Sequence, residues 1–273
     1  MNIFKLELKR SLLNKWTLIS FSIVSIICAL QCIEVYERRV ANLEYLKTQG
    51  YEAVLNICYE TPYSNWILCF PSMHWVILAY IFSLIVVLPH SMSYYKDYKS
   101  GYIKQMLTRV SAKEYTRAKY LATFISAGVV FVVPMILEFM ALATFLPLHN
   151  PHRINGMLTG ETTFGVELFY EHPVIFTFMW WCINFIIAGL FACIALVVSK
   201  YISNYFSIFI TPFMIVFIMQ TICNMLRIPG VSILNLMYAN TSHNVDFRFL
   251  PIYIIVIFVA TYFGFVSSRK EVY

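Results

Sequence analysis

The 273-residue chain is poor in charge, since only 12% of its residues are Asp, Glu, Lys or Arg, against about 25% in a soluble domain. It also lacks several sequence patterns of catalytic and metal sites. There is no G-x-x-x-x-G-K-[ST], no G-x-G-x-x-G, no H-E-x-x-H and no C-x-x-C. We therefore expect no ATP hydrolysis, no structural zinc and no cofactor in this chain. Its apolar runs hold no paired Asp, His/Glu metal set or Ser/Lys dyad, which argues against a membrane-embedded enzyme.

Hydrophobic residues are abundant instead, at 60% of the chain with a mean hydropathy of +0.69. The 23 Phe, 19 Tyr and 5 Trp suit a protein with long lipid-water boundaries, where amphipathic rings collect. A membrane-spanning helix needs about 20 apolar residues. The sequence predicts an all-α integral membrane protein whose single domain covers residues 1–273. Six spans are expected, near 16–33, 73–93, 120–146, 174–198, 202–223 and 249–268.

The distribution of Lys and Arg predicts the orientation. If the N-terminus is inside, fourteen of the twenty Lys and Arg residues fall in inner segments. Because inner segments of membrane proteins are enriched in these residues, both termini and the segment 94–119 are predicted to be cytoplasmic. The net charge of +6 is then a feature of membrane topology, and no nucleic-acid partner is expected.

Residues 1–15 combine apolar side chains at helical spacing with intervening cations, among them Lys5, Lys9 and Arg10. Such a segment is typical of a helix that lies in the membrane interface. The alternative is that these cations serve only as a topology signal. The following apolar run is longer than that of a signal peptide, and no small-x-small cleavage site follows it, so the first helix is predicted to be retained.

Three outer segments are expected, at 34–72, 147–172 and 224–248. In the first, residues 34–49 are able to extend the first helix until Gly50, and the apolar stretch 66–71 is expected to enter the outer interface. Cys58 and Cys69 share this segment and are candidates for a disulfide.

The other two outer segments carry different signals. His149, His152 and His172 lie near carboxylates in the second segment, where a cation site or solvated loop histidines are the alternatives. Pro229, Gly230 and polar residues interrupt the third segment, which predicts a re-entrant or interfacial pair of short helices between spans five and six.

The segment 94–119 is the one long, basic, water-compatible stretch between two spans. Ser100-Gly101 breaks the helix that descends from the second span, and 102–109 then reads as a short helix. Ser111 and Glu114 have the spacing of a capping box, which predicts a new helix from Ser111 into the third span. The apolar Ile103, Met106 and Leu107 have no evident cover in this chain, so a groove on another protein is expected to receive them. The alternative is an ordinary basic inner loop.

This segment resembles the permease subunits of type-2 ABC exporters. The resemblance rests on an acidic residue, a Ser-Gly break, a Leu, a Ser and basic residues before a span, at Asp97, Ser100, Gly101, Leu107, Ser111, Arg117 and Lys119. The family usually has Glu in place of Asp97 and Pro in place of Val110. The motif covers about 25 residues, while the architecture agrees over the whole chain.

The resemblance implies a function and a partner. The chain would be the transmembrane subunit of an exporter in the bacterial cytoplasmic membrane, paired with a second permease as a homodimer or heterodimer. A separate P-loop ATPase would seat the coupling helix between spans two and three. The residues assigned to this coupling are Asp97, Gly101, Tyr102, Ile103, Met106, Leu107, Arg109, Ser111 and Glu114.

The cargo expected from the apolar and aromatic walls is an amphiphilic peptide, an antibiotic or another hydrophobic compound. The alternative function is a non-transporting immunity or sensory protein that binds a peptide at its outer loops. Glu138 is the only acidic residue within a predicted span. Because a charge there is costly, Glu138 is either part of the translocation path or a hydrogen-bonded packing contact.

Overall fold

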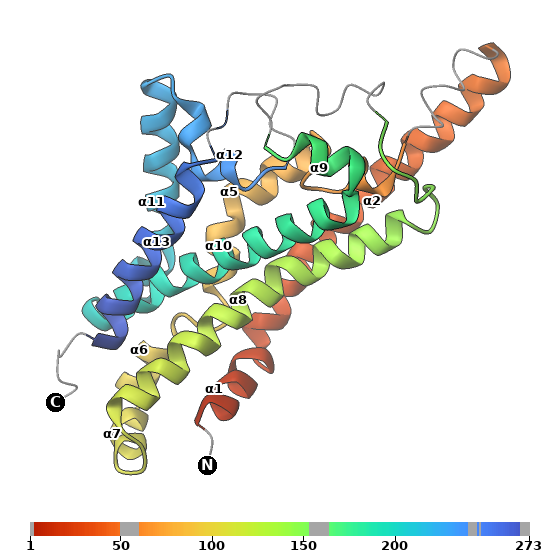
Figure 1. The fold of residues 1–273 in the computed structure, drawn as a ribbon. Coiled ribbons are helices and arrows are strands. Elements are labelled where there is room, and N and C mark those ends of the chain that lie inside the picture. The colour runs from red at the N-terminus through yellow and green to blue at the C-terminus, as the bar shows by residue number, and fades with distance from the viewer. Residues whose placement is uncertain (1–2, 50–59, 153–163, 240–244, 246, 268–273) are drawn as a thin grey trace.

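The computed structural model describes residues 3–49, 60–152, 164–239, 245 and 247–267. Every regular element in these residues is helical (Figure 1). The elements are α1 (Ile3–Leu12), α2 (Lys15–Gln49), α4 (Pro62–Asn65), α5 (Met73–Val87), α6 (Ser93–Lys99), α7 (Tyr102–Leu107), α8 (Ala112–Leu142), α9 (Val166–Glu171), α10 (Pro173–Tyr201), α11 (Tyr205–Met225), η2 (Pro229–Val231), α12 (Ile233–Leu236), α13 (Phe249–Tyr262) and the π-helical turn η3 (Phe263–Ser267).

Five helices within the described residues are long and apolar enough to cross a membrane, namely Lys15–Tyr45, Ala112–Leu142, Pro173–Tyr201, Tyr205–Met225 and Phe249–Val266. The predicted second span, near 73–93, is shorter than expected. Its helix α5 has 15 residues and is therefore about 22 Å long, less than the roughly 30 Å of a hydrocarbon layer. The helix ends before Pro89, which has no N–H to continue the hydrogen-bond ladder.

The helices α8 and α10 lie side by side along the centre of the bundle (Figure 1). Each contributes a glycine that receives a phenylalanine of the other. A Cβ atom at Gly128 would lie 2.5 Å from the Phe185 ring, and one at Gly189 would lie 2.5 Å from the Phe124 ring. The two rings meet edge-on, with centroids 5.9 Å apart. These two glycines therefore allow α8 and α10 to approach each other closely.

The first outer segment confirms one prediction and shows what covers its apolar stretch. The helix α2 continues to Gln49, as the pattern of 34–49 indicated. Trp66, Ile67 and Leu68 are fully buried in the protein core, so other parts of the chain cover them; that 66–71 enters the outer interface stays a prediction. Cys58, and with it the disulfide prediction, lies outside the described residues.

Part of the third outer segment is covered by protein. Its short helix α12 and the residues just after it pack on the same core as 66–69, while 224–228 are exposed. The Ala239 N–H donates to the Leu68 carbonyl at 2.8 Å, and the Asn184 side chain donates to the Met237 carbonyl at 3.1 Å. These bonds pair two buried backbone carbonyls within the protein.

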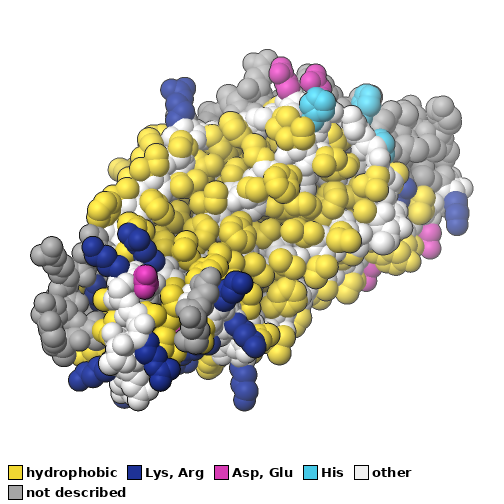
Figure 2. Space-filling view, turned by 60° about the horizontal axis from the view of Figure 1, so that its bottom comes forward, with side chains coloured by type: hydrophobic (Ala, Val, Ile, Leu, Met, Phe, Trp, Pro, Cys, Tyr) yellow, Lys and Arg dark blue, Asp and Glu magenta, His cyan; other side chains and the backbone are white. Residues whose placement is uncertain are grey.

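Figure 2 shows a broad hydrophobic surface that ends, toward α7 and the N-terminus, in a group of Lys and Arg side chains. Exposed cations at this end include Lys5, Lys9, Lys104, Arg109 and Lys113. The basic end is built from α1, α6, α7 and the first turns of α8 (Figure 1). The candidate site lies there.

Candidate functional site at the basic end of the bundle

The turn between α6 and α7 forms where the sequence predicts it. Gly101 has φ of 74°, in the left-handed region that a residue without a Cβ adopts at little cost. The helix α7 follows from Tyr102. The capping box is also confirmed, because the Glu114 N–H donates to Ser111 Oγ at 3.2 Å and the Ser111 N–H donates to Glu114 Oε2 at 3.4 Å. Local sequence therefore determines the path of this segment.

The expectation that Ile103, Met106 and Leu107 lack cover in this chain is wrong. Ile103 is 2% exposed and Met106 is 4% exposed, and Leu107 is half-buried against the same cluster. The cluster combines Tyr94 of α6 and Tyr115 and Ala118 of α8 with residues from both ends of the chain, Ile3 of α1 and Phe265 of η3. The sequence does not show this cover, because it forms only when these helices pack together.

The face that α7 turns to solvent is polar. Lys104 and Gln105 in α7 are exposed, as are Thr108 and Arg109 just after it. Tyr102, at the start of the helix, is half-buried, and the Arg10 guanidinium lies 4.7 Å from the centroid of its ring. A partner at this face would therefore meet cations and amides.

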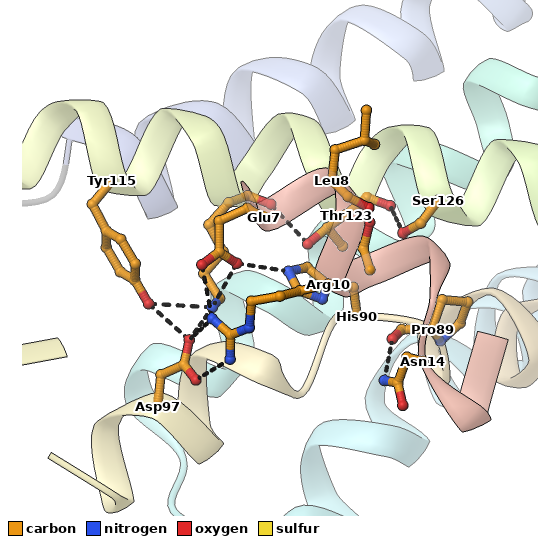
Figure 3. A network of polar contacts seen from close by, with 12 residues as sticks. Glu7, Leu8, Arg10, Asn14, Pro89, His90, Asp97, Tyr115, Thr123 and Ser126 are labelled. Carbon is orange, nitrogen blue, oxygen red and sulfur yellow. Dashed lines mark hydrogen bonds and ion pairs between the residues drawn. The ribbon is translucent and has the colours of Figure 1, made fainter. Parts of the chain in front are cut away.

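Behind α7 lies a buried ionic network centred on Glu7 of α1 (Figure 3). The Glu7 side chain is fully buried. Its carboxylate accepts from the ammonium of Lys119 at 3.2 Å and from the guanidinium of Arg10 at 2.8 Å. His90, in the turn between α5 and α6, lies 3.2 Å from the same carboxylate. The helix α1, the turn between α5 and α6, and the helix α8 therefore meet at Glu7.

The second carboxylate of the network is Asp97 of α6, which is 4% exposed. Arg10 donates to Asp97 Oδ1 at 2.9 Å, the hydroxyl of Tyr115 donates to Oδ2 at 2.9 Å, and Lys119 donates to the same oxygen. Lys119, which is fully buried, bridges Asp97 and Glu7. The network therefore ties α1 and α6 to the buried face of α8 (Figure 3).

The electrostatics favour two ionised carboxylates. Burial alone would raise the pKa of Glu7, but the His90 hydrogen bond and the charges of Lys119 and Arg10 outweigh it and lower the pKa to about 2. Burial would likewise raise the pKa of Asp97, and the same two cations hold it below its usual value. Burial lowers the pKa of His90, so the ring is neutral at pH 7 and donates to Glu7.

Sequence reasoning singled out Asp97 and placed Lys119 in the motif, but it missed their buried partners. Arg10 was read as an interfacial cation, and Glu7, His90 and Tyr115 carried no assigned role. One signal was present: Glu7 is the only acidic residue among the first 15. An acid among cations on an otherwise apolar helix marks the face that turns inward, and α1 does bury Ile3, Glu7 and Ser11.

Glu138 lies on the same helix as Lys119 but far from the network, about 28 Å further along α8 at 1.5 Å per residue. It is 3% exposed, and neither carboxylate oxygen makes a hydrogen bond of standard geometry among the described residues, although the Ile67 N–H and the Cys28 thiol interact with the group. Cys32 of α2 donates weakly, at 3.7 Å, to the backbone carbonyl of Glu138. The structure thus separates this residue from the other predicted site residues.

The described outer residues hold no group of three or more His, Cys, Asp or Glu side chains that could bind a metal ion. His149 and His172 are among the residues searched, and Glu161 lies outside them. The cation site considered for the second outer segment has no support in this part of the structure.

A bundle with five long apolar helices and a basic end defines the chain as a multi-pass membrane protein. No protein-family model, curated protein or solved structure matches it.

Proposed function

We propose that the chain is the transmembrane subunit of a type-2 ABC exporter and transmits the motion of a separate P-loop ATPase through α7. The observation that supports this proposal most is the way α7 is held. It projects at the basic end between α6 and α8, and the network behind it joins both helices to α1. A displacement of α7 would therefore move these elements together rather than bend a loose loop.

The contacts suggest a route for that motion. From α6, the displacement passes through Asp97 to Lys119 on α8 and through Arg10 to α1, which leads directly into α2. The helix α8 packs on α10 and α2 along the centre of the bundle. A push at α7 would thus reach the long apolar helices through rigid elements with charge-assisted bonds, which are stronger than neutral ones.

The burial of Ile103 and Met106 changes which residues would contact the ATPase. The proposed contact is the exposed polar face with Lys104, Gln105 and Arg109, which fits an acidic cleft. Ile103 and Met106 would instead hold α7 in place. The proposed assembly contains two permease chains in the bacterial cytoplasmic membrane, with all termini inside, α5 as a short sixth span, and an amphiphilic peptide or other hydrophobic compound as cargo.

The test uses the full-length chain captured by an affinity tag from its native membrane. The proposal predicts that a P-loop ATPase co-purifies and that its hydrolysis depends on this chain. The double variant Lys104→Glu/Arg109→Glu should lose the ATPase while retaining membrane insertion and thermal stability. The matched control is Lys5→Glu/Lys9→Glu, which makes the same charge change on exposed residues of α1.

Equal ATPase recovery with both double variants would contradict the assignment of α7 as the coupling element. Absence of any ATPase, together with saturable binding of a peptide at the outer face, would favour the non-transporting immunity or sensory alternative. Ile103→Asp is a separate probe. It should lower the stability of the chain itself, because it places a charge in a covered cluster.

A further inference from the structure

A cavity of about 400 Å³ lies beside the ionic network, between α1, the link to α2, and the turn from α5 to α6. Figure 3 shows two of its boundaries, where Asn14 approaches Pro89 and Arg10 approaches Asp97. Its volume falls in the range of about 300–1,000 Å³ typical of small-ligand sites. The ABC exporter proposal assigns this cavity no role.

The lining offers more positive charge than negative. Arg10, Lys96 and Asp97 all line the cavity. The Asp97 carboxylate already accepts bonds from Lys119 and Tyr115 on its other side. Arg10 retains 39% exposure of its side chain despite its two ion pairs. The cavity therefore presents a positive potential to a ligand.

Neutral donors add to these cations. The buried hydroxyl of Ser93 has no hydrogen-bond partner among the described residues. The Asn14 side-chain amide donates one N–H to the Pro89 carbonyl, at 3.1 Å. Because an amide nitrogen carries two N–H groups, the second can donate to a ligand. A ligand with several acceptor oxygens and a negative charge would satisfy these groups.

The cavity lies where the polar end of the molecule meets its apolar surface. Leu13 lines it and is 76% exposed. Trp16, at the start of the apolar run of α2, is 45% exposed, and the Lys96 ammonium lies 6.0 Å from the centroid of its ring. Trp and Lys side chains in this arrangement are typical of the lipid headgroup level. A ligand here would reach both the cations and the lipid.

We propose that this cavity binds the phosphodiester headgroup of an anionic phospholipid. Lys96 and the free N–H groups of Arg10 contact the phosphate, Ser93 donates to it, and the start of an acyl chain lies on Leu13. The exposed leucine favours a lipid over a free phosphate ion, because a soluble anion would leave that apolar wall in water. The bound lipid would join α1 to the α5–α6 turn next to the network.

The experiment uses Trp16 as a reporter in the purified full-length chain, reconstituted in phosphatidylcholine vesicles. Phosphatidylglycerol with brominated acyl chains quenches a nearby tryptophan, and Trp16→Phe provides the background from the other tryptophans. The dependence of quenching on the fraction of brominated lipid gives the apparent affinity. We expect brominated phosphatidylglycerol to quench Trp16 at a much lower fraction than brominated phosphatidylcholine.

The double variant Ser93→Ala/Lys96→Gln should reduce this preference by at least about tenfold, because the loss of even one charge-assisted hydrogen bond corresponds to that factor and the variant removes two contacts. Neither residue forms part of the ionic network, and an unchanged thermal unfolding midpoint would verify the fold. Lys99→Gln is the matched control, because Lys99 is also an exposed lysine of α6 but does not line the cavity. It should keep most of the preference.

Three outcomes would overturn the proposal. Equal quenching by the two brominated lipids would show that no anion site exists. Equal loss of preference in Lys99→Gln and Ser93→Ala/Lys96→Gln would show diffuse surface attraction. Removal of the preference by free glycerol phosphate would assign the site to a soluble anion rather than to a lipid.

Discussion

Replacing Lys119 by methionine should destabilise the protein by about 3–5 kcal/mol, the cost of breaking a buried ion pair by removing one partner. Lys119 is fully buried, and its ammonium contacts both Glu7 and Asp97. Methionine has a similar volume, so the change removes the charge and leaves little cavity. Arg10 and His90 cannot replace the lost contacts, because both already bond to the carboxylates from other sides.

A double-mutant cycle separates the charge effect from packing. Glu7→Gln removes the carboxylate that would be left without its buried cation, so the double variant Glu7→Gln/Lys119→Met should be more stable than the sum of the single changes predicts. Coupled neighbours in one network typically differ from additivity by about 0.5–3 kcal/mol. Lys113→Met, an exposed position on the same helix, should change stability by about 0.5 kcal/mol or less.

The assay is unfolding of the purified chain by a denaturing detergent in mixed micelles, followed by near-ultraviolet circular dichroism, with thermal unfolding as a second readout. A loss below about 1 kcal/mol for Lys119→Met would refute the claim that the network is a buried, paired structure. Additive single and double variants would also refute it, since they would mean that Lys119 and Glu7 do not interact.

The remaining predictions concern pH, helix packing and the isolated carboxyl. The depressed pKa of Glu7, from 4.5 to about 2, means that its contribution is present above about pH 4.5 and is lost as pH falls toward 2. Stability measured across that window should drop by about 3 kcal/mol, and Glu7→Gln should flatten the curve. Gly189→Ala should lower the free energy of unfolding by about 1–3 kcal/mol, because its Cβ would overlap the Phe124 ring. Gly264→Ala is the control, because its Cβ would lie 3.1 Å from the nearest atom, and it should lower stability less in the same assay. Glu138→Gln should change stability by less than about 1 kcal/mol, because the amide has the same shape and the carboxyl makes no hydrogen bond of standard geometry. A loss of more than about 2 kcal/mol would contradict this and show that the contacts with Ile67 and Cys28 are strong.

Local signals predicted the basic segment well. The break at Gly101 and the capping box at Ser111 depend on residues a few positions apart, and both appear in the structure. The extension of the first helix to Gln49 has the same origin. The second span was predicted too long, because hydropathy does not register the hydrogen bond that Pro89 removes.

The interpretation of Ile103 and Met106 failed for a different reason. Their apolar pattern correctly indicated burial, but the pattern cannot say what covers them. The cover combines Tyr94, Tyr115 and Ala118 of the adjacent helices with the distant Ile3 and Phe265. The sequence analysis therefore predicted that another protein covers these residues, whereas the chain covers them itself.

Composition and the spacing of apolar runs determined that this is a helical membrane protein, because the cost of unpaired backbone groups in lipid leaves few alternatives. Tertiary structure alone decided that Glu7, Arg10, Asp97 and Lys119 form one network. These residues belong to three helices separated by up to 112 positions, and each looks like an ordinary interfacial charge in isolation. They can be buried only because each meets its counter-charge, and that meeting depends on how α1 folds onto α8.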